Sequence, residues 1–393
     1  MNSEKRKVAV LGSTGSVGTQ AIDALSVTDS EYTLLTGGRN TELLAAQARA
    51  TKAAVCAVPD EGCASELRLL LAGEKTKVIG GERAIEEGIA ESGAELIVHS
   101  ISGMAGIPAA IAASKTGARL AIANKESIIS VGDIIIGNIK KSGGELIPVD
   151  SEHSAIFQCL SASGAIDAKG NARPELVKRI LLTASGGPFF GKTREELENV
   201  TCEMALAHPT WKMGQKIPLD CATMMNKGFE VIEAARLFKV DIDKIEVLVH
   251  RQSIVHSMVE FVDTQIIAQL GTPDMRHCVR YALTYPDRMK VCDEGLDFTK
   301  IASLTFDEPD RDTFPLLDAA SSAYKIGTTA PAALISADEE AVAAFMKGKI
   351  SFNGIADAVI QTLGRFTPSS EYTVESVFDA ENEARNIARD IIG

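Results

Sequence analysis

The sequence has 393 residues, with 40 Lys and Arg against 53 Asp and Glu, a net charge of −13 and 45% hydrophobic residues. This length suffices for two or three domains that each bury a core without disulfides or a structural metal. The acidic balance and the lack of a long basic block argue against a nucleic-acid partner, so any anion-binding site must be local. The apolar runs fall far short of the ~18 residues of a membrane helix, which argues against a membrane partner.

The seven cysteines form an odd number without a C-x-x-C pair. This usage favours reduced thiols in a cytosol-like compartment. The start of the chain lacks the long apolar region and the small-residue cleavage site of a signal peptide. We therefore expect a cytoplasmic protein.

The first part of the chain alternates short apolar runs of strand length with Ala-rich helical stretches. A strand is predicted over residues 7–11 and a helix over 19–25, with a glycine loop between them. Further strands are predicted over 32–36, 54–58, 77–79, 96–99, 119–123 and 145–149, with helices such as 42–50 and 108–114 between them. This alternation predicts an α/β fold that begins with a Rossmann-like, doubly wound parallel sheet, which we place at residues 1–148.

The glycine loop follows the first strand with the spacing G-x-x-G-x-x-G, at Gly12, Gly15 and Gly18. Such glycines allow backbone N–H groups to approach a pyrophosphate at the positive end of a helix. A tight turn is the alternative interpretation of the spacing alone. The position between a strand and a helix favours dinucleotide binding.

The second strand indicates which dinucleotide binds. An NAD site usually carries an acidic residue about 20 residues further on, which binds the ribose 2′-hydroxyl. Here the strand leads into Gly37-Gly38-Arg39-Asn40 instead. Because Arg39 would pair with a 2′-phosphate, we expect NADPH; the alternative is an exposed loop arginine.

After Pro148 the pattern changes, and residues 149–290 are predicted to form a central α+β catalytic domain. Its strands are predicted over 179–183, 246–250 and 257–261. The long connection 185–218 contains Trp211, the only Trp, and is interpreted as a flap over a ligand. Residues 291–311 have the composition of a linker. Residues 312–393 are predicted to form a C-terminal helical bundle, with Val359 and Ile360 on one apolar helix face.

Two acidic residues, Asp150 and Glu152, follow the strand 145–149. If the backbone stays extended, both carboxylates project to the same side and His153 points to the opposite side. Carboxylate oxygens without His or Cys on their face suit a hard cation, Mg²⁺ or Mn²⁺. A solvated strand end is the alternative interpretation of this pair alone.

A second polar cluster is predicted on a helix. Asn226 and Glu230 are i,i+4 neighbours there, and Lys227 lies three residues before Glu230. Glu230 would complete a metal site of three carboxylates and leave coordination positions open to a substrate. The alternative is an exposed helix face with a Lys–Glu pair.

Three further segments carry polar groups that a ligand would use. Ser185-Gly186-Gly187 offers a hydroxyl and backbone N–H groups that are able to hold an anion. His208 is followed by Trp211, a candidate lid, and by the flexible Gly214. Lys125 comes directly after the strand 119–123, where open α/β sheets place ligands, so we expect it to point into the cleft. A solvated lysine is the alternative for Lys125.

Eight segments, taken in order along the chain, are similar to segments of one enzyme family. They are Gly12–Gly18, Ala123–Ser127, Pro148–His153, Ala184–Phe189, His208–Lys216, Ala222–Gly228, Gln252–Phe261 and Ala268–Met275. Over essentially the whole chain they resemble the 1-deoxy-D-xylulose 5-phosphate reductoisomerases. The resemblance implies an NADP-dependent oxidoreductase, usually a homodimer, that requires Mg²⁺ or Mn²⁺. The implied reaction is a metal-assisted retro-aldol/aldol isomerisation of 1-deoxy-D-xylulose 5-phosphate, followed by hydride transfer from NADPH. It gives 2-C-methyl-D-erythritol 4-phosphate in non-mevalonate isoprenoid biosynthesis.

Matched position by position, the family's functional residues fall on three groups of this chain. The metal ligands fall on Asp150, Glu152 and Glu230, and the catalytic residues are these three together with Lys125 and His208. The substrate contacts fall on Lys125, Ser151, Glu152, Ser185, His208, Trp211, Cys221, Asn226, Lys227 and Glu230. The cofactor contacts fall on Thr14, Gly15, Ser16, Val17, Gly38, Arg39, Asn40, Asn124, Glu126 and Gly214.

The chain departs from the family pattern at a few positions. Cys221 stands where the family ordinarily has a serine that donates to the substrate phosphate, and a thiol is a poorer donor. We therefore expect weaker phosphate binding, by on the order of 1 kcal/mol. Smaller departures are Thr210 for Asn, Arg251 for Pro, and Ser336-Ala-Asp-Glu where the family tends to read Asn-Ala-Ala-Asn.

Two rival functions use the same features differently. An acyl-phosphate or semialdehyde reductase also opens with a glycine-rich NADP loop, and Cys221 would be its nucleophile. That enzyme needs no metal cluster. A regulatory NADPH sensor would bind the cofactor without turnover, but the density of polar residues over 150–152, 208–214 and 220–230 argues against it.

Overall fold

The amino-terminal part of the chain folds around a seven-stranded parallel sheet. The computed structural model describes residues 5–167, 170–207, 216–291 and 294–393. The sheet has the strand order β4-β3-β2-β1-β5-β6-β7. The strands are β1 (Arg6–Leu11), β2 (Ser30–Thr36), β3 (Val55–Val58), β4 (Lys77–Gly80), β5 (Leu96–His99), β6 (Arg119–Ile122) and β7 (Glu145–Pro148). The predicted Rossmann-like sheet is confirmed.

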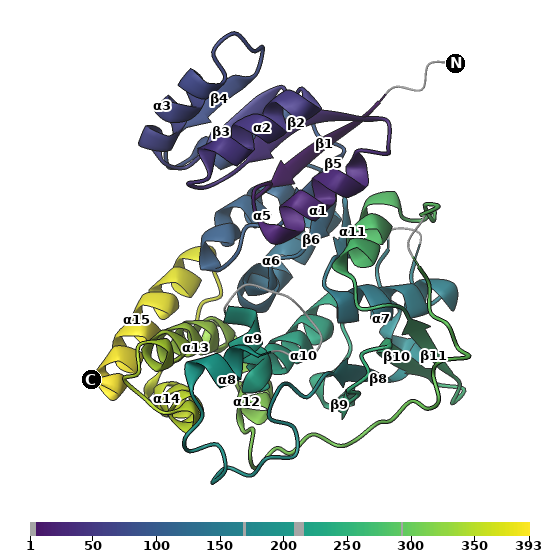
Figure 1. The fold of residues 1–393 in the computed structure, drawn as a ribbon, viewed down its shortest axis with the longest axis vertical. Helices are drawn as coiled ribbons and strands as arrows, with labels where there is room; N and C mark the ends of the chain where they lie inside the picture. Colours follow the sequence, from purple (N-terminus) through teal and green to yellow (C-terminus); the bar gives the residue numbers. More distant parts are fainter. Residues whose placement is uncertain (1–4, 168–169, 208–215, 292–293) are drawn as a thin grey trace.

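Helices cover both faces of this sheet and bury its strands (Figure 1). They are α1 (Ser16–Leu25), α2 (Thr41–Thr51), α3 (Glu61–Leu70), α4 (Ala84–Ser92), α5 (Ile107–Ser114) and α6 (Lys125–Ser142), with the 3₁₀ turn η1 (Met104–Gly106). Val8 to Leu11 are fully buried, as expected for a strand covered on both faces. The chain runs outward from β1 to β4 and then returns to β5, so the order reverses between β1 and β5. Open α/β sheets bind ligands at the carboxyl ends of strands beside such a reversal.

The glycine loop between β1 and α1 depends on two close approaches of the backbone. Gly12 has φ +76°, a conformation that L side chains rarely adopt. Its N–H donates to Thr36 Oγ1 of the neighbouring β2 at 2.9 Å. A Cβ on Gly18 would lie 2.2 Å from the Gly12 carbonyl oxygen, so only glycine lets α1 pack this closely on the loop.

The central part of the chain builds a four-stranded sheet in the order β11-β10-β8-β9. Its strands are β8 (Val177–Ala184), β9 (Ile245–Val249), β10 (Val255–Phe261) and β11 (Ile266–Leu270). β10 is antiparallel to both of its neighbours, whereas β8 and β9 are parallel. The three predicted strands are confirmed; β11 is an additional strand that was not predicted.

Helices surround this second sheet and join it to the rest of the molecule. They are α7 (Ser151–Ala162), α8 (Cys202–Leu206), α9 (Lys216–Ala222), α10 (Met225–Phe238) and α11 (Met275–Thr284), with the 3₁₀ turns η2 (Pro174–Leu176) and η3 (Ile242–Lys244). α10 contacts α6, α7, α9 and α12, so it is the central helix of the molecule. α11 packs against α1 of the amino-terminal part.

The last part of the chain is helical, as predicted. Its helices are α12 (Leu316–Ile326), α13 (Ala330–Met346), α14 (Phe352–Arg365) and α15 (Val374–Ile392); α12 packs against α10, and α13 packs against α6 (Figure 1). Val359 is fully buried, but Ile360, expected on the same apolar face, is 42% exposed. Consecutive helical residues lie about 100° apart, so Val359 faces the core whereas Ile360 turns toward solvent.

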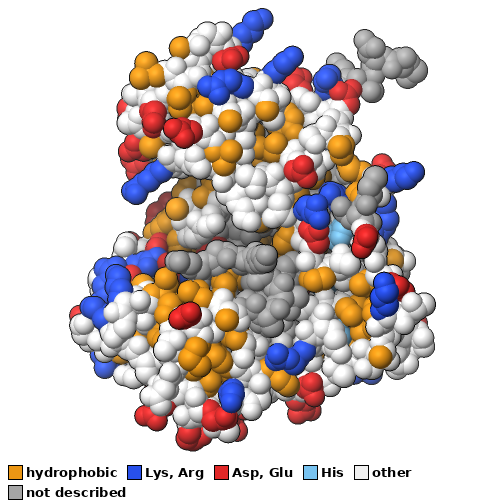
Figure 2. Space-filling view, in the orientation of Figure 1, with side chains coloured by type: hydrophobic (Ala, Val, Ile, Leu, Met, Phe, Trp, Pro, Cys, Tyr) orange, Lys and Arg blue, Asp and Glu red, His pale blue; other side chains and the backbone are white. Residues whose placement is uncertain are grey.

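The distribution of charge on the surface and the composition of the helices bear on nucleic-acid and membrane partners. Over the visible face, Lys and Arg side chains are interspersed with Asp and Glu (Figure 2). Within the described residues, no helix combines the length and the apolar composition needed to cross a bilayer.

Candidate active site

Lys125 stands at the carboxyl end of β6, where α6 begins. The Asn124 side chain caps this helix by accepting a hydrogen bond from Ser127 N at 2.8 Å, and this fixes the start of α6. Lys125 Nζ donates to Asp150, and it lies 3.3 Å from Glu230 Oε1 and 3.4 Å from Glu233 Oε2. The ammonium group of Lys125 therefore lies among carboxylates from the start of α7 and from α10, and its role toward a ligand stays a prediction.

The backbone at Asp150 differs from the expected extended form. Asp150 is the N-cap of α7, and Ser151 and Glu152 already belong to the helix. The prediction that His153 points away from Asp150 is therefore wrong, because residues i and i+3 of a helix lie on the same face. His153 Nδ1 is 3.5 Å from Asp150 Oδ1.

His153 joins the α7 segment to the α10 segment. Its Nε2–H donates to the backbone carbonyl of Glu230 at 2.9 Å. Burial opposes protonation of the ring, but the carboxylates of Glu233 and Asp150 outweigh it and raise the pKa of His153 to about 9. The ring is thus an imidazolium at neutral pH, and both of its nitrogens are protonated.

Three carboxylates converge at this place, as the sequence predicted. Oxygen atoms of Asp150, Glu152 and Glu230 all lie within 4.8 Å of one another. Burial and the Glu230 carboxylate raise the pKa of Glu152 to about 7. Burial acts in the same direction on Asp150, but the Lys125 ammonium and His153 hold its pKa well below the ordinary value.

This donor set fits a divalent cation with a preference for oxygen. Three carboxylates without His or Cys are the ligands that Mg²⁺ and Mn²⁺ favour. Ligand atoms of a second group, formed by Asp150, His153 and Glu233, also lie within 4.8 Å of one another. It fits less well, because the imidazolium form of His153 has no free lone pair for a metal.

Glu233 is a site residue that sequence reasoning missed. It lies one helical turn after Glu230 on α10 and is buried. Burial raises the pKa of Glu233 to about 7, although Lys125 and His153 oppose the shift. The i,i+3 spacing of Glu230 and Glu233 was the available signal, since it places both carboxylates on one helix face.

A polar region borders the carboxylate cluster on the side of α9 and α10. Lys227 is buried, and its Nζ lies 3.1 Å from Glu152 Oε1 and also donates to Glu230. Asn226 Nδ2 donates to Glu230 as well. The predicted helix face that carries Asn226, Lys227 and Glu230 is confirmed, but it is directed into the site and not toward solvent.

The Ser185 turn packs against α9 next to these groups. Gly186 and Gly187 both have positive φ, of +76° and +65°. Gly187 N–H donates to Ser185 Oγ at 3.3 Å. A Cβ on Gly187 would lie 2.6 Å from the Cys221 carbonyl oxygen, so the turn and the helix touch through their backbones. Arg251 adds a cation here, with its Nη1 3.5 Å from the Gly187 carbonyl oxygen.

The Cys221 thiol is not activated as a nucleophile. Burial, and next the Glu230 carboxylate, raise the pKa of Cys221 far above its ordinary value. The reactive form of cysteine is the thiolate, so this residue is almost entirely in the unreactive form at neutral pH.

The candidate cofactor residues that the structure describes lie at the carboxyl ends of β1, β2 and β6. Gly15 is the N-cap of α1 without a side-chain cap, which leaves backbone N–H groups for an anion. The other residues of this loop are Thr14, Ser16 and Val17, and Gly38, Arg39 and Asn40 are exposed just past β2. Asn40 also caps α2, through the hydrogen bond from Leu43 N at 3.1 Å. Asn124 donates to Glu126 Oε2 at 2.6 Å.

Three candidate residues, His208, Trp211 and Gly214, fall in 208–215, outside the described residues. The interpretation of this segment as a flap therefore stays a prediction.

Models of a single family match most of the chain. The model described as 1-deoxy-D-xylulose 5-phosphate reductoisomerase matches residues 8–132. Two C-terminal domain models of the same enzyme match residues 146–238 and 270–387.

Whole proteins and solved structures agree with these matches. A Caldanaerobacter subterraneus subsp. tengcongensis protein named 1-deoxy-D-xylulose 5-phosphate reductoisomerase is 45% identical over 385 residues, 97% of each chain. A Zymomonas mobilis structure of that name, in complex with NADPH, has a TM-score of 0.92 and 41% identity over 99% of both chains. A DOX-P reductoisomerase structure with NADPH, fosmidomycin and magnesium has a TM-score of 0.89 and 35% identity over 98% of both chains. This chain belongs to the 1-deoxy-D-xylulose 5-phosphate reductoisomerase family.

Proposed function

We propose that this chain converts 1-deoxy-D-xylulose 5-phosphate to 2-C-methyl-D-erythritol 4-phosphate with NADPH and a divalent metal, in non-mevalonate isoprenoid biosynthesis. The observation that carries the proposal is the convergence of Asp150, Glu152 and Glu230 at the carboxyl edge of the Rossmann-like sheet. The names of the relatives, and the NADPH and magnesium in the solved structures, support it.

Asp150, Glu152 and Glu230 would hold Mg²⁺ or Mn²⁺. Such a cation supplies Lewis acidity that stabilises negative charge on substrate oxygens. Lys125 and Lys227 lie among these carboxylates and hold them in place, and both ammonium groups would donate to oxygens of a bound substrate in exchange for some of these contacts. His153 ties Asp150 to the backbone of Glu230, so the carboxylates keep their relative positions.

The phosphate group of the substrate would bind at Ser185, Cys221, Asn226 and Lys227, with Ser151 close to the metal ligands. The support is the direct packing of the Ser185 turn on α9 and the short step from α9 to Asn226. Binding energy gained at this remote group serves to orient the reacting carbons. Lys227 belongs to both the proposed phosphate region and the carboxylate cluster, because its Nζ also lies 3.1 Å from Glu152 Oε1.

NADPH would bind across the carboxyl ends of β1, β2 and β6. Backbone N–H groups at the start of α1 suit its pyrophosphate, around Thr14, Gly15, Ser16 and Val17. Arg39, with Gly38 and Asn40, would meet the 2′-phosphate. Asn124 and Glu126 lie just past the end of β6, on either side of Lys125, and NADPH bound there would have its nicotinamide near the carboxylates.

The rival reductase with a cysteine nucleophile is disfavoured. Its reaction needs a thiolate, whereas burial keeps the Cys221 thiol protonated. The buried carboxylate cluster would have no role in that reaction. A non-catalytic NADPH sensor leaves the cluster unexplained as well.

We infer in addition that the enzyme acts as a cytoplasmic homodimer. β11 forms one edge of the four-stranded sheet, and its first residue, Ile266, is 49% exposed; Val262, in the turn between β10 and β11, is 58% exposed. Exposed apolar residues at a sheet edge favour pairing with another chain, which supports the dimer. The cysteines of the described residues are all free thiols, as expected in a reducing compartment, which supports the cytoplasmic location. Light scattering after size exclusion tests the dimer: a monomer mass would contradict it.

The activity is tested by following NADPH oxidation with 1-deoxy-D-xylulose 5-phosphate, with and without added Mg²⁺ or Mn²⁺. We expect turnover that EDTA abolishes and that either metal restores. Turnover that persists in EDTA but is lost in Cys221→Ser would instead support the reductase with a cysteine nucleophile. Tight NADPH binding without any turnover would support the sensor.

A further inference from the structure

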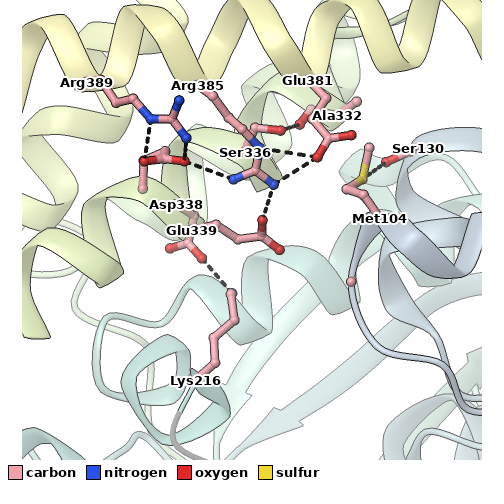
Figure 3. A network of polar contacts seen from close by, with 12 residues as sticks. Met104, Ser130, Lys216, Ala332, Ser336, Asp338, Glu339, Glu381, Arg385 and Arg389 are labelled. Carbon is pink, nitrogen blue, oxygen red and sulfur yellow. Dashed lines mark hydrogen bonds and ion pairs between the residues drawn. The ribbon is translucent and has the colours of Figure 1, made fainter. Parts of the chain in front are cut away.

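Lys216 joins three helices through one ammonium group. It is the first residue of α9, and its Nζ donates to Asp220 Oδ2, one turn along the same helix, at 2.5 Å. Nζ also donates to Asp338 Oδ2 on α13 at 2.8 Å. It lies 5.4 Å from the centre of the Phe229 ring on α10. Figure 3 shows the side chain of Lys216 pointing from α9 toward Asp338.

Both acidic partners of Lys216 are removed from solvent. Asp338 is 0% and Asp220 is 4% exposed. The Lys216 side chain is 33% exposed, so separating the pair is costly mainly for Asp338, whose charge would remain buried without a partner. The pair between Lys216 and Asp338 therefore fixes the start of α9 relative to α13.

The position of α9 depends on such contacts. The helix has seven residues, too few to be stable without tertiary packing. It ends close to Cys221, whose carbonyl touches the Gly187 turn. The chain then turns at Met224, with φ +62°, directly into the helix that carries Asn226. A displacement of α9 would move Cys221 and the Ser185–Gly187 turn together.

We propose that Lys216 and Asp338 are positioning residues for the site that holds the substrate's phosphate group. The inference rests on the proposed function, because that function assigns the phosphate to Ser185, Cys221 and Asn226. Lys216 acts through α9 and not through its own contact with substrate.

The test compares steady-state kinetics of Lys216→Gln, Asp338→Asn and the double variant. We expect KM for 1-deoxy-D-xylulose 5-phosphate to rise about tenfold in Lys216→Gln and about threefold in Asp338→Asn, as the loss of a charged hydrogen bond implies. The double variant is expected to match Lys216→Gln, because both substitutions remove the same interaction. We expect kcat to fall by less than KM rises, the dissociation constant of NADPH to stay within about twofold, and Lys216→Arg to restore most of the substrate affinity.

Arg385 provides a matched control. It contacts Glu339, Glu340 and Glu381, all on α13 or α15, and so ties these two helices together next to Asp338 (Figure 3). Arg385→Gln therefore weakens the helical bundle and leaves the link to α9 intact. We expect its KM to equal that of the wild type.

The outcomes separate this inference from the proposed function. Absence of turnover in the wild type overturns the proposed function. Turnover with an unchanged KM in Lys216→Gln and Asp338→Asn overturns the positioning role, as does an equal rise of KM in Arg385→Gln. If Lys216→Gln does not fold, the isosteric Asp338→Asn decides by the same KM criterion.

Discussion

His153 donates a hydrogen bond from Nε2 to the backbone carbonyl of Glu230 at 2.9 Å, across 77 residues of sequence. The same ring faces Asp150 through Nδ1 at 3.5 Å. One ring thus contacts both the carboxylate at the start of α7 and the backbone of α10. The three carboxylates of the proposed metal site depend on these contacts.

Glu230→Gln tests the metal site. An amide oxygen is a weak ligand for a hard cation, so we expect Mn²⁺ affinity to fall and kcat to drop by at least about 100-fold. Calorimetric titration of Mn²⁺ measures the affinity without requiring turnover. Glu246→Gln removes an exposed carboxylate that pairs with Arg179 and is the control, expected to change neither quantity. Unaltered Mn²⁺ affinity in Glu230→Gln would contradict the assignment.

Cys221→Ser tests the departure from the family pattern. A hydroxyl is a better donor than a thiol, so we expect KM for the substrate to fall about fivefold, or about 1 kcal/mol, with little change in kcat. Cys63→Ser, on α3 far from the phosphate region, is the control. No improvement in Cys221→Ser would mean that the site already accommodates the thiol.

Arg39→Gln tests the cofactor preference. Loss of a charge-assisted hydrogen bond to the 2′-phosphate is expected to lower kcat/KM for NADPH by about 10- to 100-fold and to leave NADH nearly unaffected. The ratio of the two kcat/KM values is the measurement. Arg49→Gln, in the last turn of α2, is a control that retains the ratio of the wild type. An unchanged ratio in Arg39→Gln would assign the arginine to an exposed loop without a role in binding.

Gly18→Ala tests the packing of the glycine loop. The added Cβ would meet the Gly12 carbonyl oxygen at 2.2 Å and Ser13 Cα at 2.7 Å, and these backbone atoms cannot rotate away. We expect a loss of about 3 kcal/mol in the free energy of unfolding, measured in urea. Gly137→Ala on α6 is the opposite case, because no atom lies within 4 Å of its Cβ position. It is expected to stabilise the protein by up to about 1 kcal/mol.

Asp220→Asn tests the buried carboxylates near Lys216. Burial, and next the Asp338 carboxylate, raise the pKa of Asp220 well above its ordinary value. As pH rises above about 4, the unfolded chain releases this proton and the folded chain keeps it, so stability falls toward the raised pKa. Asn does not titrate. The difference in unfolding free energy between Asp220→Asn and the wild type should therefore increase, in favour of the variant, by up to about 1.4 kcal/mol per pH unit in this range.

Urea unfolding at several pH values from 5 to 8 measures this difference. Asp357→Asn removes an exposed carboxylate that pairs with Arg194 and is the control. Its unfolding free energy is expected to change with pH as that of the wild type does. Parallel curves for Asp220→Asn would show that Asp220 is ionised in the folded protein.

The sequence determined the features that depend on local order. Buried apolar runs alternating with helices predicted the parallel sheet, and the glycine spacing placed a dinucleotide loop after β1, because the periods of strands and helices and the freedom of glycine are local properties. The three carboxylates were found for the same reason. Their residue types and their positions after a strand and on a helix face are visible in the chain.

Only the tertiary structure decided which groups meet. Whether Asp150 begins a helix, and hence whether His153 faces it, depends on the packing of α7 against β10 and β11. The roles of Glu233, and of Lys216 with Asp338, arise from contacts between helices that are distant in sequence. Periodicity places a side chain on a face of its own helix, but burial and the neighbouring charges set its partners and its pKa.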